Sequence, residues 1–180
     1  QVVSSSLAKW AKDDPMAALA WIRENGEKHP DLVTDDARLG LISGAAGQDP
    51  KLAFSLINEL GLKDPKDAVS KILETAKTAS ERTAALAAFR DHLATITDAN
   101  ERTNTAADGA QELAQSAAKE GFEAGSQWID SAGFSPEELA RITDARVSYN
   151  IKSEDTGKWV EWMGTKNPDA KSDNNIRRMV

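Results

Sequence analysis

The sequence predicts an all-α fold, a right-handed α-solenoid of about ten helices arranged as irregular helix–turn–helix repeats. Two observations lead to this prediction. A helix-start signal recurs at Asp14-Pro15, Asp49-Pro50 and Asp64-Pro65, and Ser135-Pro136 and Asn167-Pro168 repeat it with other capping residues. The residues around these signals also align when the chain is shifted by about 35 positions, a usual length for a helix-pair repeat.

The start signal has a direct physical basis. A helix begins with four backbone N–H groups that have no partner within the helix. An Asp, Ser or Asn before the helix accepts a hydrogen bond from one of them. Pro suits the first helical position because its ring already fixes a helical φ. Pro also disfavours helical geometry at the residue before it, so each Asp-Pro ends one helix and starts the next.

The helices follow in chain order from these signals and from apolar residues at three- and four-residue spacing. The predicted segments are 2–12, 15–25, 34–47, 50–60, 65–77, 80–95, 101–120, 122–132, 136–149 and 155–163, with a further helix beginning within 173–180. Their apolar residues include Val3, Leu7, Trp10, Met16, Leu19, Ile22, Leu39, Leu41, Ile42, Leu52, Leu56, Ile57, Val69, Ile72, Leu73, Phe122, Trp128, Ile129, Trp159, Val160 and Met163. Gly26, Gly61, Gly133 and Gly164 follow four of the predicted ends, where Gly is common.

Two segments are less regular. Gly109 falls inside the long run 101–120 and weakens the case for one continuous helix. Arg146–Lys152 alternates apolar and polar residues, so a strand and a helix both remain open there.

Internal similarity divides the chain into repeat units. A shift of 35 residues aligns Asp14-Pro15 with Asp49-Pro50, and a shift of 107 aligns Trp21-Ile22 with Trp128-Ile129. The predicted units lie near 2–30, 34–61, 65–96, 100–133 and 136–164, with 172–180 beginning another. We therefore expect residues 1–180 to form a single helical-repeat domain, and we expect the chain to be a fragment of a longer protein. The alternative is an irregular all-α domain in which Asp-Pro recurs by chance.

The pattern Trp-Ala-x-x-Asp-Pro-x-x-Ala-x-x-Trp-Ile, from Trp10 to Ile22, resembles a family of helical repeats. These repeats, marked by Trp and Asp-Pro, occur in large, mostly uncharacterised bacterial proteins of the verrucomicrobial type, and their size is similar to that of tetratricopeptide and HEAT-like units. The first unit carries the pattern in full, whereas the second lacks both Trp residues. The resemblance implies an α-solenoid and supplies no catalytic residue.

Composition excludes several functional classes. The net charge of −7 disfavours nucleic-acid binding, because an acidic surface repels phosphate groups. No apolar run is long enough to cross a bilayer, so no membrane insertion is expected in this segment. The absence of Cys excludes disulfides and thiolate chemistry. A chain without Cys is consistent with a soluble protein that is exported or periplasmic, but the Cys count does not determine the cellular compartment.

Short polar motifs give no coherent active site. Ser6 with Lys9 and Ser116 with Lys119 fit Ser-x-x-Lys, and Ser172-Asp173-Asn174 fits the second motif of serine β-lactamases, but Lys-Thr-Gly is absent. His29 and His92 lie far apart without zinc-site spacing. We predict no enzyme, no catalytic residue, no metal site and no cofactor.

The five Trp residues are the candidates for specific contacts. Trp10 and Trp21 are expected to pack together within the first helix pair, and Trp128 occupies the repeat position of Trp21. Trp159 and Trp162 share one helix face because they are three residues apart. They serve either as core residues or as the aromatic lining of a groove for a peptide or sugar.

These observations favour a noncatalytic helical-repeat scaffold that binds a protein or peptide through an extended surface. The alternatives are a structural spacer within a larger repeat protein and, less favoured, an enzyme or glycan binder with a site of unfamiliar type.

Overall fold

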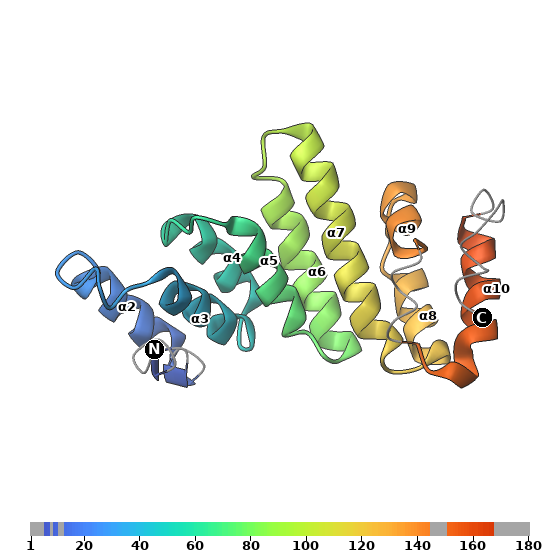
Figure 1. The fold of residues 1–180 in the computed structure, drawn as a ribbon, viewed down its shortest axis with the longest axis horizontal. Helices are drawn as coiled ribbons and strands as arrows, with labels where there is room; N and C mark the ends of the chain where they lie inside the picture. The colour runs from blue at the N-terminus through green and yellow to red at the C-terminus, as the bar shows by residue number, and fades with distance from the viewer. Residues whose placement is uncertain (1–5, 8, 11–12, 145–150, 168–180) are drawn as a thin grey trace. The chain divides into compact units, whose positions relative to one another are not determined.

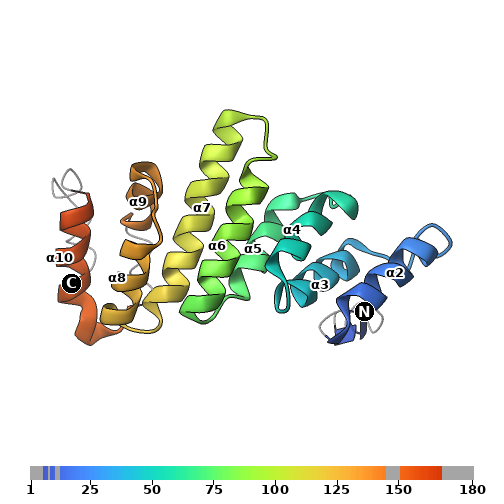
Figure 2. The same ribbon diagram turned by 180° about the vertical axis from the view of Figure 1, so that it is seen from behind.

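A computed structural model describes residues 6, 7, 9, 10, 13–144 and 151–167, and confirms the all-α prediction, since these residues contain no strand. Figures 1 and 2 show the helices from opposite sides. Their bounds are α2 (Pro15–Asn25), α3 (Asp35–Ala46), α4 (Pro50–Glu59), α5 (Pro65–Glu74), α6 (Ala79–Leu93), α7 (Ala99–Ala118), α8 (Phe122–Ser131), α9 (Pro136–Ile142), the 3-10 helix η2 (Ser153–Asp155) and α10 (Thr156–Lys166).

The predicted start signals are confirmed for α2, α4, α5 and α9, each of which begins at the Pro of its signal. Asp14 Oδ1 accepts from Ala17 N at 3.0 Å, and Asp49 Oδ1 accepts from Lys51 N at 2.9 Å. Ser135 forms a capping box, because its hydroxyl accepts from Glu138 N while Glu138 accepts from Ser135 N. These side chains therefore satisfy backbone N–H groups that would otherwise lack partners.

Several boundaries differ from the prediction. Helix α9 ends at Ile142 rather than near residue 149, with Thr143 as its C-cap residue; the Thr143 backbone N–H and hydroxyl both donate to Leu139 O. Helix α6 is started by Thr78 rather than Ser80: Thr78 Oγ1 accepts from Glu81 N, and Glu81 Oε2 accepts from Thr78 N. Helix α7 is continuous across Gly109, which is buried.

Two predictions fall wholly or partly outside the described residues. The alternating stretch Arg146–Lys152 is described only at its last two positions. Asn167 ends α10 as its C-cap residue, and the helix start predicted after it lies beyond residue 167.

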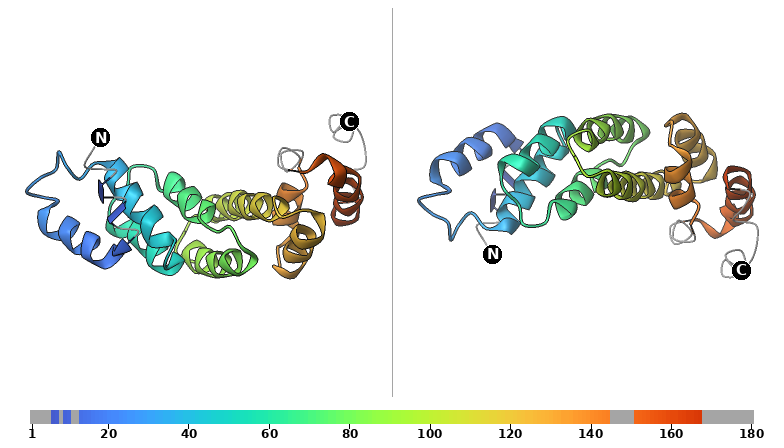
Figure 3. Two further views of the ribbon diagram at one scale, coloured as in Figure 1. Left: turned by 90° about the horizontal axis from the view of Figure 1, so that it is seen from below. Right: turned by 90° about the horizontal axis from the view of Figure 1, so that it is seen from above.

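The chain divides into two compact units that share α6. The first unit is Gln1–Ala76 with Ala84–Thr95, and the second is Lys77–Thr83 with Ile96–Val180. In the first unit, α3 packs against α4 and α5, and the Phe54 ring of α4 stacks on the Phe89 ring of α6 at 5.8 Å. In the second unit, α7 packs against α8 and α9, and α8 contacts α10 (Figure 3).

Small residues let the helices of the second unit approach closely. The buried face of α7 includes Ala110, Ala114 and Ala117, each at most 1% exposed. Gly125 of α8 lies against this face, since a Cβ atom added there would stand 2.8 Å from Ala117 O. A larger side chain at position 125 would therefore push α8 away from α7.

Most long-range polar contacts join residues about one repeat length apart. In the first unit, Arg23 of α2 pairs with Glu59 of α4, which is 36 positions later. In the second unit, Lys158 Nζ of α10 lies 3.0 Å from Glu123 Oε1 of α8, and the two residues are 35 positions apart. Arg141 Nε of α9 donates to Asp108 Oδ1 of α7 across a separation of 33 positions. In each pair, a helix contacts the helix two places along the chain.

The Asp49 cap can be tested by substitution. Asp49→Ala should lower the free energy of unfolding by about 1 kcal/mol, because two N–H groups of α4 lose their acceptor. Pro50→Ala should have a milder effect, since Pro is tolerated at the first turn but not required there. Chemical denaturation measures both changes, with Lys51→Ala at an exposed position of the same turn as the control. A loss for Asp49→Ala no larger than for the control would contradict the capping role.

Candidate functional site

The structure separates the five Trp residues into two groups. Trp128, Trp159 and Trp162 are 6%, 1% and 7% exposed, whereas Trp10 is 38% exposed and Trp21 is half-buried. The ring contacts found among the described residues do not include the expected pair of Trp10 with Trp21. Burial gives the three later Trp residues a packing role within the second unit.

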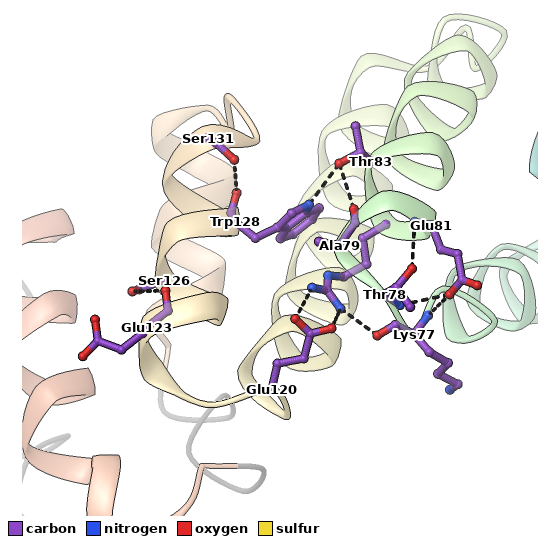
Figure 4. Close-up of polar contacts among 11 residues, drawn as sticks. Lys77, Thr78, Ala79, Glu81, Thr83, Glu120, Glu123, Ser126, Trp128 and Ser131 are labelled. Carbon is purple, nitrogen blue, oxygen red and sulfur yellow. Dashed lines mark hydrogen bonds and ion pairs between the residues drawn. The ribbon is translucent and has the colours of Figure 1, made fainter.

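Trp128 lies at the centre of a polar cluster built on the start of α6 (Figure 4). Its Nε1 donates to Thr83 Oγ1 at 3.2 Å, and the Arg82 guanidinium lies over its ring at 5.1 Å. Phe134 contacts the same ring edge-on at 5.8 Å. The indole thus combines apolar burial with a satisfied N–H group and a cation–π contact.

Arg82 is the most deeply buried charge among the described residues, with 0% exposure. Its two terminal nitrogens donate to the two Glu120 oxygens at 3.2 and 3.0 Å, and Nη1 also donates to Lys77 O. Its Nε atom is buried without a hydrogen-bond partner. The bidentate pair offsets the desolvation cost of the guanidinium, which indicates a structural rather than a reactive group. Arg82 cannot be recognised from the sequence alone, because its burial depends on contacts with Glu120 and Trp128, which are distant along the chain.

A second aromatic cluster joins α8 to α10. The Trp159 ring meets Phe122 and Trp162 edge-on at 5.1 and 5.4 Å. Asp130 Oδ1 accepts from Trp162 Nε1 at 3.2 Å and lies 2.7 Å from Lys166 Nζ. Trp159 Nε1 is buried without a partner. The cluster fixes α10 on α8 and offers no open aromatic surface at Trp159.

The start of α8 obtains its cap from a residue distant in sequence. Gly121 precedes α8 with φ of 104°, a conformation that favours Gly, and it has no side chain to cap the helix. Asp155 Oδ2, 33 positions later, accepts from Phe122 N at 3.0 Å instead. Helix α8, which has no Asp-Pro before it, is therefore capped by an acidic residue from the start of α10.

A polar groove lies between α7 and α9 and has a volume of about 410 Å³. We call it the α7–α9 groove; its lining residues are Thr103, Asn104, Ala107, Glu137, Ala140, Arg141, Thr143, Asp144 and Asn167. Arg141 is held against Asp108, while Asn167 Nδ2 donates to Thr143 Oγ1 at 3.4 Å. Hydrogen bonds from its own backbone N–H and from Ser135 keep the pKa of Glu137 below its ordinary value. The groove therefore presents amides and an ionised carboxylate in a hollow open to solvent.

Among the described residues, the other polar motifs do not assemble into a catalytic set. Ser6 and Lys9 are exposed, as is Lys119, and Ser172 lies outside the described residues. His29 is exposed in a loop, whereas His92 stacks on Phe54 with ring centres 5.1 Å apart. Burial lowers the pKa of His92 below its ordinary value of 6.5. Within the described ranges, no group of three or more His, Asp or Glu residues is arranged to hold a metal ion.

No helix in the described part of the chain combines the length and the apolar character needed to span a bilayer. Comparison with known proteins gives no match to a family model, to a curated protein or to a solved structure.

Trp128→Ala should lower the free energy of unfolding by about 3–5 kcal/mol, because it removes a buried ring and leaves Arg82 without its aromatic partner. Trp10→Ala is the matched control, since Trp10 is exposed and should give a loss several times smaller. Urea denaturation of both variants measures the difference. A loss below about 1 kcal/mol for Trp128→Ala would show that the ring does not support the core.

His92 predicts a pH dependence of stability. Its folded-state pKa is depressed, so the unfolded chain binds a proton near pH 6.5 that the folded chain takes up only at lower pH. The free energy of unfolding should therefore fall as pH is lowered from about 7.5 to about 5.5. Denaturation across this range should show a weaker dependence for His92→Gln than for the control His29→Gln. An unchanged dependence in His92→Gln would contradict the assignment.

Proposed function

We propose that the chain is a noncatalytic helical-repeat scaffold, a right-handed α-solenoid that binds a protein or peptide partner. The observation that carries the proposal is the spacing of its long-range contacts. Arg23 with Glu59, Asp108 with Arg141 and Glu123 with Lys158 are separated by 36, 33 and 35 positions. Such spacing is expected when each helix packs on its equivalent in the next repeat.

The direction of neighbouring repeats supports the same architecture. At the starts of α8 and α10, Phe122 N donates to Asp155, and near their ends Asp130 lies against Lys166. The start of α8 contacts the start of α10, and the end of α8 contacts the end of α10, so these two helices run parallel. In a helix–turn–helix repeat, equivalent helices run parallel and successive helices alternate in direction. A stack of this kind presents an extended surface on which side chains from successive repeats can contact one ligand.

The resemblance of Trp10–Ile22 to bacterial Trp- and Asp-Pro-marked repeats is part of this proposal, and it too favours a solenoid.

A structural spacer is the second candidate function. It is favoured by Trp10 and Met16, which are 38% and 55% exposed and would be covered if another helix pair packed beside them. Spacer and scaffold differ in whether this segment binds a ligand itself.

Selection from a peptide-display library and pull-down from an extract of the source organism would test the scaffold function. The bait is the 180-residue chain, and the control bait is an unrelated all-helical protein of similar size and charge. We expect partners that are recovered reproducibly by the chain and not by the control. Reproducible recovery of nothing beyond the control would contradict the scaffold function and favour the spacer.

A further inference from the structure

Helix α6 carries one anchor of each compact unit. Its start lies in Lys77–Thr83, which belongs to the second unit, and its remainder lies in Ala84–Thr95, which belongs to the first. The 15 residues of α6 contain neither Gly nor Pro, and the helix crosses the boundary without interruption. Because each helical N–H donates to the carbonyl four residues earlier, the first four N–H groups beyond the boundary bond to carbonyls before it.

The start of α6 is fixed within the second unit. Thr78 Oγ1 accepts from Glu81 N at 3.3 Å, and Glu81 Oε2 accepts from Thr78 N at 2.9 Å. One turn later, Arg82 is held by both oxygens of Glu120 and lies over the Trp128 ring (Figure 4). These contacts hold the first turn in place. Formation of that turn is the unfavourable step in making a helix, by about a factor of 10³.

The end of α6 is held within the first unit. The Phe54 ring of α4 stacks on Phe89 with ring centres 5.8 Å apart and on His92 with ring centres 5.1 Å apart. Both Phe rings are buried, as is Leu93 in the last turn. The helical part on this side of the boundary, residues 84–93, is shorter than the about 12–15 residues at which an isolated helix becomes marginally stable.

We infer that α6 is a conformational coupler: the contacts that fix its start in the second unit also keep its end docked on α4 in the first unit. A helix that already has its first turn extends without a second nucleation step, so residues 84–93 remain helical while that turn holds. The effect is reciprocal by linkage, because undocking the end removes apolar contacts that keep the helix formed. A ligand that stabilised one unit would therefore stabilise the other, whether or not the chain is a scaffold.

Native-state hydrogen exchange of the whole chain, followed by NMR, tests the coupling from the second unit to the first. The variant is Thr78→Ala, which removes the side-chain acceptor at the start of α6. The control is Ser135→Ala, which removes the corresponding acceptor of the capping box of α9 in the same unit. The reporters are the amides of residues 88–93, whose helical hydrogen bonds lie wholly on the first unit's side of the boundary.

We expect Thr78→Ala to accelerate exchange at residues 83–86 and at residues 88–93 alike, by about fivefold, the factor that corresponds to a lost cap. Ser135→Ala should leave residues 88–93 at the wild-type rate. Acceleration confined to residues 83–86 would mean that the start frays alone, which overturns the inference. Equal acceleration of residues 88–93 in both variants would assign the effect to global unfolding and would overturn the inference as well.

The reverse direction is reported by the indole N–H of Trp128, which donates to Thr83 Oγ1 of α6 within the second unit. Phe54→Leu removes the ring stack in the first unit. Ile72→Val is the control, because it shortens a fully buried side chain of α5 in the first unit. Exchange of the indole N–H should accelerate severalfold in Phe54→Leu and not in Ile72→Val. A wild-type rate in Phe54→Leu, or an equal acceleration in both variants, would contradict the coupling.

Discussion

Most helices in this chain are too short to be stable alone. Seven of the α-helices in the described residues, α2 to α5 and α8 to α10, have 7 to 12 residues, and isolated helices shorter than about 12–15 residues are marginal in water. Each must therefore bury one face against another helix. The contacts observed are with the next helix and with the helix two places along, as in α3 with α4 and α5 and α7 with α8 and α9. This requirement explains both the Ala-rich faces and the repeat spacing of the polar contacts.

Caps and packing are linked at the starts of the helices. Where Asp-Pro is present, the residue before the helix caps it locally, as Asp14 and Asp49 do. Where it is missing, at α8, Asp155 from the start of α10 provides the acceptor, so one contact both caps α8 and joins it to α10. The Arg82 cluster acts similarly: a buried guanidinium joins the start of α6 to Glu120, which follows α7, and to Trp128 on α8. Each such residue joins the start of one helix to a residue of another helix or of the segment that follows it.

The sequence was sufficient to predict features that depend on local chemistry. The all-α class, the Pro starts and the Ser135 capping box follow from residues within one turn of each other, and the structure confirms them. Features that depend on contacts between helices distant in sequence could not be predicted, such as the burial of Arg82 and the cap from Asp155. The α7–α9 groove was missed for the same reason, since Asn104 and Asp144 are distant in sequence and ordinary surface residues by type. The exposure of Trp10 shows that an aromatic residue in a repeat pattern is not always core.

Helices α8 and α10 run parallel, and we propose that they are equivalent helices of successive repeats. Because the chain has no Cys, paired substitutions can test this with a short bis-maleimide crosslinker. The in-register pairs are Glu123→Cys with Lys158→Cys and Asp130→Cys with Lys166→Cys, whose native side chains lie 3.0 and 2.7 Å apart. The crossed pairs, Glu123→Cys with Lys166→Cys and Asp130→Cys with Lys158→Cys, are displaced along the helices by about 10 Å. Crosslinking should be fast for both in-register pairs and slow for both crossed pairs. Crossed pairs that react as fast as the in-register pairs would contradict the repeat architecture.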